Sequence, residues 1–215
     1  TYLCALKACG STGSIDNGNH IHDQVVTEKL LEKGTVLGNA LVDMYVKCGM
    51  LRKAREVLEK LSARNVATWN VLISGYACQG HHVHVFHLFE KMIEKGVQPD
   101  EVILLRVLSV CSHAGFVDEG HYYLANISKA CFISITTEHC NCIIDLFSRA
   151  GRLNEAIAML EKMPCEPDLV TWTIMLGACQ NWGNIELGKR AFDGASRMDM
   201  GHATSFVLMS NILCQ

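Results

Sequence analysis

Proline is scarce in this chain, with three residues out of 215. Because proline breaks helices, this small number of prolines favours long regular elements. A strong excess of one charge is also missing, since the formal net charge is −3. The composition therefore gives no global electrostatic field of the kind that draws a protein to nucleic acid or to a membrane.

Long hydrophobic runs are absent as well. The most apolar stretch, "VILLRVLSVC" at Val102, is interrupted by Arg106 and is too short to span a bilayer. No signal or transit peptide is visible, and the chain begins at Thr1 without a methionine, so we expect an upstream segment to be missing. The sequence thus predicts no contact with a membrane.

The signatures of common enzymes are also lacking. No phosphate-binding loop, dinucleotide-binding fingerprint or nucleophile–base motif occurs. The eleven cysteines form no CxxC pair, and we expect them to be reduced thiols buried as small apolar residues. We therefore predict that these residues form no enzyme and need no cofactor or small-molecule substrate.

Two clusters of potential metal ligands attract attention. Four histidines lie within seven residues, at His81, His82, His84 and His87. A zinc site needs closed tetrahedral ligation with supporting partners, and nothing else nearby is placed to supply them. Cys140 and Cys142 form a CxC pair, whose side chains would point about 200° apart on a helix. We expect a solvated helix face and a packing role, respectively, and no metal.

What the chain does have is a repeat. Similar strings recur, such as "KACGSTGSIDNG", "SVCSHAGFVDEG" and "GACQNWGNIELG". Six glycines mark one point of the repeat, with spacings of 36, 31, 35, 36 and 32 residues: Gly13, Gly49, Gly80, Gly115, Gly151 and Gly183. Five residues after each comes a second marked position, which is Gly or Ala in five of the six units. A period in this range is typical of solenoid proteins.

Each unit is predicted to be a helical hairpin. Apolar residues at helical spacing form a first helix, the glycine allows a tight turn, and a second amphipathic helix follows, as in "LRKAREVLEKL". The small residue in the second helix would let two helices approach closely. Pro99 and Pro167 end two of the units. Because one hairpin cannot bury both of its faces, neighbouring hairpins must stack into an all-α solenoid.

This organisation resembles the pentatricopeptide repeat family, in particular its plant arrays of alternating P, L and S motifs. The strings that carry the resemblance are "ATWNVLISGYACQG…LFEKMIEKGVQPD", "GNALVDMYVKCG" and "DLFSRAGRLNEAIAMLEKMPCEPD". The resemblance implies a right-handed superhelix of helix-turn-helix repeats in residues 1–168. The expected L, S, P, L and S units are 1–34, 35–65, 66–100, 101–136 and 137–168. Residues 169–215 resemble the extension motifs that follow such arrays, with the second one truncated.

The resemblance also implies a function, because repeats of this family read single-stranded RNA at one base per repeat. The fifth and last residues of a unit read the base, and the pairs here are Asn39 with Asn65, Asn70 with Asp100, and Asn141 with Asp168. In the family, Asn with Asp favours uridine and Asn with Asn a pyrimidine. Leu3 and Leu105 cannot hydrogen-bond to a base, and Thr173 is assigned none.

The second residue of each unit should flank the base. Val36, Ala67, Val102 and Val170 are suitably apolar, whereas Glu138 departs from this pattern. Two cations lie two residues before a turn glycine, where the family contacts phosphate: Lys47 and Arg149. Three uncharged or histidine residues occupy the equivalent places elsewhere, so we expect a thin basic track and weak RNA affinity.

The implied role is that of a specificity factor in organellar RNA processing or C-to-U editing, located in the mitochondrion or chloroplast. A cytidine deaminase domain or editing factors would then act with it, in the same chain or another. The H-x-E and P-C-x-x-C motifs of that deaminase chemistry do not occur in these residues. Two alternatives stay open: a helical-repeat scaffold that binds protein, as tetratricopeptide solenoids do, and a degenerate fragment that binds nothing.

Overall fold

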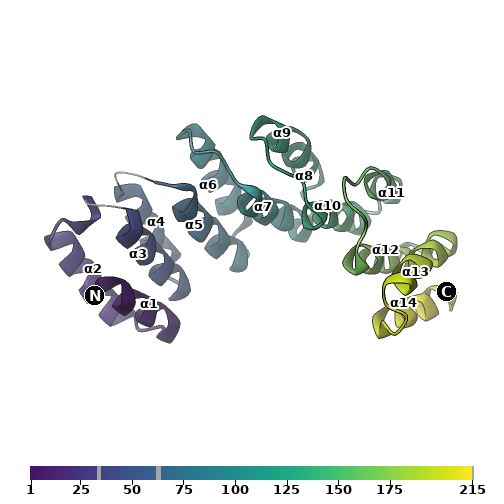
Figure 1. The fold of residues 1–215 in the computed structure, drawn as a ribbon, viewed down its shortest axis with the longest axis horizontal. Coiled ribbons are helices and arrows are strands. Elements are labelled where there is room, and N and C mark those ends of the chain that lie inside the picture. The colour runs from purple at the N-terminus through teal and green to yellow at the C-terminus, as the bar shows by residue number, and fades with distance from the viewer. Residues whose placement is uncertain (33–34, 62–63, 215) are drawn as a thin grey trace. The chain divides into compact units, whose positions relative to one another are not determined.

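The computed structural model describes residues 1–32, 35–61 and 64–214, and every regular element in these residues is helical (Figure 1). The all-α prediction is therefore confirmed. The chain divides into two compact units, residues 1–107 and 108–215. No helix in the described residues is long and apolar enough to cross a membrane.

The helices of the first unit are paired. They are α1 (Tyr2–Thr12), α2 (Ile15–Thr27), the short 3₁₀ turn η1 (Leu30–Glu32), α3 (Thr35–Lys47), α4 (Leu51–Lys60), α5 (Val66–Cys78), α6 (His82–Glu94) and the start of α7 (Glu101–Ala114). Figure 1 shows α1 with α2, α3 with α4, and α5 with α6 as successive hairpins. Trp69, Tyr45 and Phe89 are among its largest fully buried side chains.

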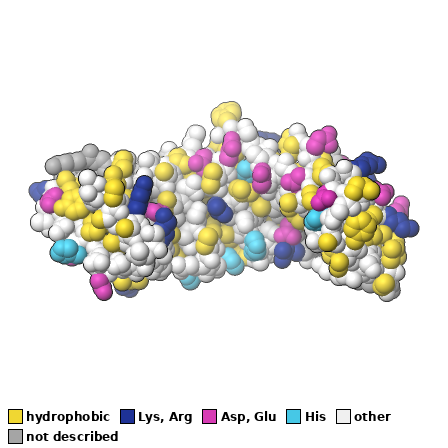
Figure 2. All heavy atoms as spheres, turned by 60° about the horizontal axis from the view of Figure 1, so that its bottom comes forward, with side chains coloured by type: hydrophobic (Ala, Val, Ile, Leu, Met, Phe, Trp, Pro, Cys, Tyr) yellow, Lys and Arg dark blue, Asp and Glu magenta, His cyan; other side chains and the backbone are white. Residues whose placement is uncertain are grey.

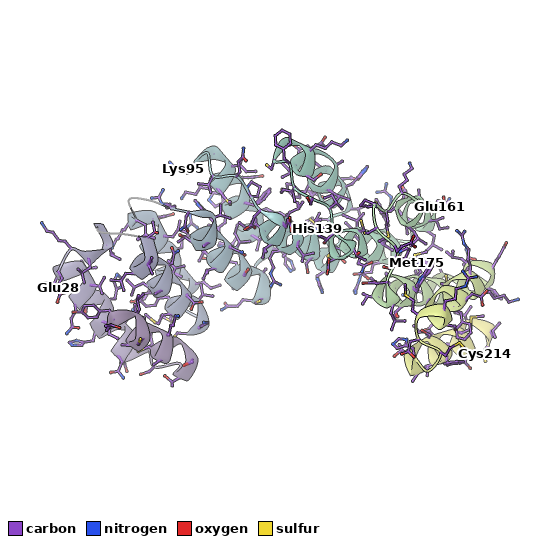
Figure 3. All side chains as sticks on the ribbon, viewed as in Figure 1. Glu28, Lys95, His139, Glu161, Met175 and Cys214 are labelled. Carbon is purple, nitrogen blue, oxygen red and sulfur yellow. The ribbon has the colours of Figure 1, made fainter. Side chains whose placement is uncertain are left out.

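The second unit continues with the rest of α7. Its further elements are α8 (Val117–Tyr122), the π-helical turn η2 (Tyr123–Ile127), α9 (Ser128–Ala130), α10 (Thr137–Arg149), α11 (Leu153–Glu161), α12 (Leu169–Trp182), α13 (Ile185–Met198) and α14 (Ala203–Leu213). Ile143, Leu146 and Met175 are fully buried in its core. Figure 3 labels Met175 within α12 and His139 at the start of α10.

The six repeated glycines all adopt the left-handed backbone conformation. Their φ angles lie between 68° and 75°, a region that costs other residues energy because of their Cβ atoms. At one of these turns, the amide of Met50 donates to the carbonyl of Tyr45 over 2.8 Å, which satisfies a carbonyl at the end of α3. The predicted tight turns are thus confirmed.

The small residues five positions later allow close helix contact. A Cβ atom at Gly18 would lie 2.6 Å from Sδ of Met44, and one at Gly120 would lie 2.5 Å from a methyl carbon of Leu146. Ala54 and Ala156 are fully buried at the equivalent place. Larger side chains there would force the helices apart, as the sequence predicts.

One second helix departs from the simple hairpin. In the expected unit 101–136, it passes from α8 through the π-helical turn into α9. The buried hydroxyl of Ser128 donates to the carbonyl of Leu124, four residues earlier. A serine that bonds back to the helix competes with the regular backbone ladder. The rare π-helical turns of proteins occur mostly as single turns inside α-helices, as here. The sequence pattern did not predict this π-helical turn.

The cysteines follow the prediction only in part. All are free thiols, but only Cys9, Cys111, Cys140 and Cys179 are buried, while Cys4, Cys78 and Cys214 are exposed. Burial raises the pKa of the Cys111 thiol to about 12 and that of Cys140 to about 11. These two thiols are therefore protonated near neutral pH and act as packing groups, as expected for Cys140.

Candidate functional site

A network of three polar side chains joins the end of one repeat to the next helix. Asp168 begins α12 as its N-cap, and its Oδ1 accepts from the amide of Thr171 over 2.8 Å. Asn141 on α10 donates from Nδ2 to the same Oδ1 over 3.2 Å. The hydroxyl oxygen of Thr171 lies 2.6 Å from Oδ1 of Asn141 and 2.8 Å from Oδ1 of Asp168. Since it carries one proton, it donates to one of them at a time.

The first unit contains the same network with asparagine in place of aspartate. Asn65 is the N-cap of α5 and accepts from the amide of Thr68 over 3.0 Å. Asn39 on α3 donates to Oδ1 of Asn65 over 3.4 Å, and the Thr68 hydroxyl lies 2.8 Å from that Oδ1. In both networks a buried threonine holds the side chains that the sequence predicts to face a base.

The third predicted pair is arranged differently. Asp100 accepts from the amide of Ile103 over 2.9 Å, so it precedes α7 as a cap, but isoleucine has no hydroxyl to offer. Asn70 instead accepts from the hydroxyl of Ser74, 3.2 Å away on α5. No hydrogen bond joins Asn70 to Asp100 in the part of the chain that the structure describes. The amide of Asn70 therefore keeps more of its hydrogen-bonding capacity for a ligand.

The carboxylate of Asp168, in the network with Asn141 and Thr171, has a lowered pKa. Burial alone would raise the pKa of Asp168, but hydrogen bonds from the amide and hydroxyl of Thr171 and from Asn141 outweigh it, so its pKa lies below the ordinary value. The side chain is thus ionised at neutral pH. It can accept hydrogen bonds from a base edge or hold a bridging water, but it cannot donate.

The four predicted flanking residues are exposed apolar side chains. Val36 is 65% exposed, Val102 46% and Val170 56%, and Ala67 is also exposed. Single apolar residues on a surface are common, but these four share one register position near the start of a first helix. They are therefore available to pack against the face of a base. Glu138 is exposed at that position of α10.

Both predicted phosphate-binding cations already have a partner. Nζ of Lys47 lies 2.7 Å from Oδ2 of Asp43, and Nε of Arg149 lies 2.8 Å from Oδ2 of Asp145. Each acid lies one helical turn before its cation, and Asp145 also accepts from Ser112. The basic track is therefore partly neutralised within the chain. Figure 2 shows Lys and Arg side chains scattered among Asp and Glu on the face in view, without a continuous basic stripe.

A hollow of about 530 Å³ in the first unit brings several predicted site residues together. Asn70 and Ala67 from α5, Val102 from α7 and Lys47 from α3 all line it. Its lining also includes Arg106, the residue that interrupts the apolar run at Val102. A smaller hollow of about 260 Å³ in the second unit is lined by residues that include Val170, Thr173 and His202.

Two of the four clustered histidines, His81 and His84, contact the ring of Tyr76. The rings of Tyr76 and His84 are stacked at a centroid distance of 5.0 Å, and His81 meets both edge-on. Within the described residues, no group of three or more His, Cys, Asp or Glu side chains is placed to hold a metal ion.

Sequence reasoning missed four residues that orient the predicted site. Thr68 and Thr171 lie three residues after an N-cap, in "NVAT" and "DLVT", and this spacing is a signal for a cap that could have found them. Asp43 and Asp145 lie four residues before the two cations, where ion pairs form on helices. Both signals are local, so they are readable without a structure.

Comparisons with known proteins agree with this architecture. A family model described as "PPR repeat family" matches residues 64–102 and 136–181, and one described as "PPR repeat" matches residues 39–66. A putative pentatricopeptide repeat-containing protein of Arabidopsis thaliana is 39% identical over 213 residues, which are 97% of this chain and 42% of that protein. A mitochondrial pentatricopeptide repeat-containing protein of the same plant is 38% identical over 99% of this chain and 33% of its own length.

Solved structures share the fold. The pentatricopeptide repeat protein PPR10 in complex with an 18-nt psaJ RNA element matches with a TM-score of 0.64 and 23% identity, over 97% of this chain and 31% of that one. Nuclear proteinaceous RNase P 2 from A. thaliana matches with a TM-score of 0.65 and 14% identity, over 84% of this chain and 41% of that one. The structure is that of an α-solenoid of helical hairpins. The chain belongs to the pentatricopeptide repeat family, and it spans less than half the length of these relatives.

Proposed function

We propose that this chain binds single-stranded RNA and reads one base per repeat. The observation that supports this best is the network of Asn141, Asp168 and Thr171, because it orients an amide and a carboxylate from adjacent repeats. The equivalent network at Asn39 and Asn65 has the same geometry. The RNA element bound by the structural relative PPR10 adds support for this ligand class.

The readout would follow the chemistry of the paired side chains. Asn70 with Asp100 and Asn141 with Asp168 would select uridine, and Asn39 with Asn65 a pyrimidine. Val36, Ala67, Val102 and Val170 would pack against the faces of these bases, and Lys47 and Arg149 would contact phosphates after leaving Asp43 and Asp145. Each cation must give up an ion pair with a carboxylate before it can bind a phosphate, and this loss offsets part of the binding free energy. The affinity of this chain alone for RNA should therefore be low.

The organellar role is part of the proposal. A specificity factor would deliver a catalytic partner, such as a cytidine deaminase domain in the same protein or another, to a chosen cytidine. A relative named as mitochondrial supports a mitochondrial or chloroplast location. The residues described contribute recognition and no catalysis in this proposal, and the division into P, L, S and extension motifs belongs to it.

Two observations favour a second candidate, a scaffold that binds protein. The two best-placed cations are ion-paired and the net charge is −3, which weakens attraction to phosphates. A direct competition separates the two functions. Fluorescence anisotropy would compare a pyrimidine-rich single-stranded RNA, duplex DNA of the same sequence and a peptide library. Salt-sensitive binding to the RNA alone is expected, and equal affinity for duplex DNA, or binding to peptides only, would reject the proposal.

A further inference from the structure

Arg106 carries the uncompensated positive charge of the hollow around Asn70. The charged residues of the hollow lining are Asp43, Lys47 and Arg106. Asp43 and Lys47 neutralise each other across 2.7 Å. The side chain of Arg106 is exposed, and no ion pair to it occurs in the residues that the structure describes. An anion that enters the hollow therefore meets the Arg106 guanidinium as its available cation.

The position of Arg106 on α7 relates it to the predicted base contact. It follows Val102 by four residues, so the two side chains lie on one helix face. Val102 lines the same hollow as Asn70 and Ala67. A base that packed against Val102 and hydrogen-bonded to Asn70 would thus have the guanidinium beside it. The neighbouring residue Leu105, at the base-reading position of this unit, offers no hydrogen bond.

We propose that Arg106 binds the phosphate of the nucleotide whose base Asn70 reads. This inference rests on the proposed function and adds a positioning residue to it. A guanidinium presents several N–H donors in a plane and can engage two phosphate oxygens, and it has no acceptor with which to read a donor on a base. The expected unit 101–136 would then contribute a phosphate contact in place of a base contact. The amide of Asn70, with no bond to Asp100, would receive its base in a defined position.

Binding titrations on the full chain test this assignment. Arg106→Gln should lower the affinity for a uridine-containing single-stranded RNA roughly tenfold, as for the loss of a charge-assisted hydrogen bond. It should also reduce the slope of log affinity against log salt by about 0.7, the value for one phosphate on a single strand. Arg106→Lys should keep most of the slope. Arg52→Gln is the matched control, because Arg52 lies on α4 outside the hollow, with its side chain 91% exposed.

A scan of the RNA backbone locates the contact. Each phosphate in turn is replaced by a neutral methylphosphonate, and binding is measured with wild-type protein and with Arg106→Gln. We expect one linkage whose neutralisation weakens RNA binding by the wild type but not by the variant, next to the nucleotide whose base Asn70 is proposed to read. Circular dichroism melting of each variant verifies that the fold is intact.

Three results would overturn the assignment. If Arg106→Gln changes the ranking of the four bases, Arg106 contacts a base. If it changes neither affinity nor salt slope while wild-type protein binds RNA, the proposed function stands and this inference fails. If wild-type protein binds no single-stranded RNA, the proposed function fails and this inference falls with it.

Discussion

Asn141 and Asp168, 27 residues apart in the sequence, are joined by a hydrogen bond of 3.2 Å from Nδ2 to Oδ1. One residue lies within α10 and the other begins α12, so the bond connects two successive first helices. Thr171 fixes both partners from one turn into α12.

Replacing Asn70 with threonine should change the base that one repeat prefers. By family resemblance, threonine with aspartate reads guanine, whereas Asn70 with Asp100 reads uridine. A net hydrogen bond is worth about 1 kcal/mol, so we expect a shift of several-fold confined to one nucleotide. Competition among four RNAs that differ only there, at one salt concentration, measures it. An unchanged ranking would reject the register assigned to this unit.

Replacing Thr171 with valine should weaken both the fold and the readout at Asn141. The hydroxyl would be lost at nearly constant volume, and the amide oxygen of Asn141 and the amide of Asp168 would lose a partner. We expect a loss of about 1–2 kcal/mol in the free energy of unfolding, measured by urea denaturation, together with poorer discrimination at one nucleotide. Thr27→Val, which removes an exposed hydroxyl that donates to the carbonyl of Asp23, should cost less than about 0.5 kcal/mol. Equal effects of the two changes would contradict the network.

Replacing Asp43 with asparagine should strengthen RNA binding. Lys47 would lose its partner and become available to a phosphate. The salt slope should steepen by about 0.7, and the affinity should rise several-fold at low salt. Glu56→Gln is the control, since it removes the same charge from the exposed Arg52–Glu56 pair on α4. If both variants gain equally, net charge is the cause and the Asp43–Lys47 pair has no special role.

The histidine cluster should be dispensable for RNA. Glutamine at positions 81, 82, 84 and 87 removes the stacking of His84 on Tyr76. The loss of such an aromatic pair should lower the free energy of unfolding by about 0.5–1.5 kcal/mol. RNA affinity should stay within twofold or so, because no predicted contact involves these side chains. Metal analysis of purified wild-type protein provides a second measurement. Stoichiometric zinc that disappears in the variant would contradict this expectation.

His22 should make stability depend on pH. Burial, together with Lys60 and Lys53, lowers the pKa of His22 below 6.5 despite the nearby Asp23, and Nδ1 contacts the hydroxyl of Tyr45 at 2.8 Å. The unfolded chain therefore takes up this proton first as the pH falls. The contribution is complete above about pH 6.5 and is lost as the pH drops through the folded pKa. Denaturation at pH 7, 6 and 5 should show a smaller decline for His22→Gln, and the exposed His20→Gln should behave as wild type.

The hairpins were predictable because each depends on local chemistry. Each hairpin has a glycine that ends its first helix and, in all but one case, a small residue five positions later in its second helix. Both recur in the sequence at a regular spacing. The pairs Gly49 with Ala54 and Gly151 with Ala156 could be recognised without knowing which helices pack against them. The starts of α3, α5, α7, α10 and α12 fall at or beside the first residues of the expected units.

The parts that the sequence did not predict depend on contacts between elements. The pairing of Asn39 with Asn65 could be expected from the family, but the contact of the Thr68 hydroxyl with both side chains depends on the packing of α3 against α5. The location of Arg106 beside Asn70 requires α5 and α7 to be placed side by side. Exposure of Cys4, Cys78 and Cys214 was missed because composition cannot tell which helix face a residue occupies.

The last residue of an expected repeat caps the next helix in addition to its proposed role in base reading, and this limits how such a protein can be reprogrammed. Asn65, Asp100 and Asp168 each accept a backbone amide at the start of the following helix. Apart from glycine, a replacement without a short side-chain oxygen would cost roughly 1 kcal/mol in helix stability, whatever it did for the base. The residues that this position accepts at little cost in stability are therefore nearly restricted to Asn, Asp, Ser, Thr and Gly. An engineer who wants a wider choice of bases must vary the partner within the first helix, where Asn39, Asn70 and Asn141 carry no capping duty.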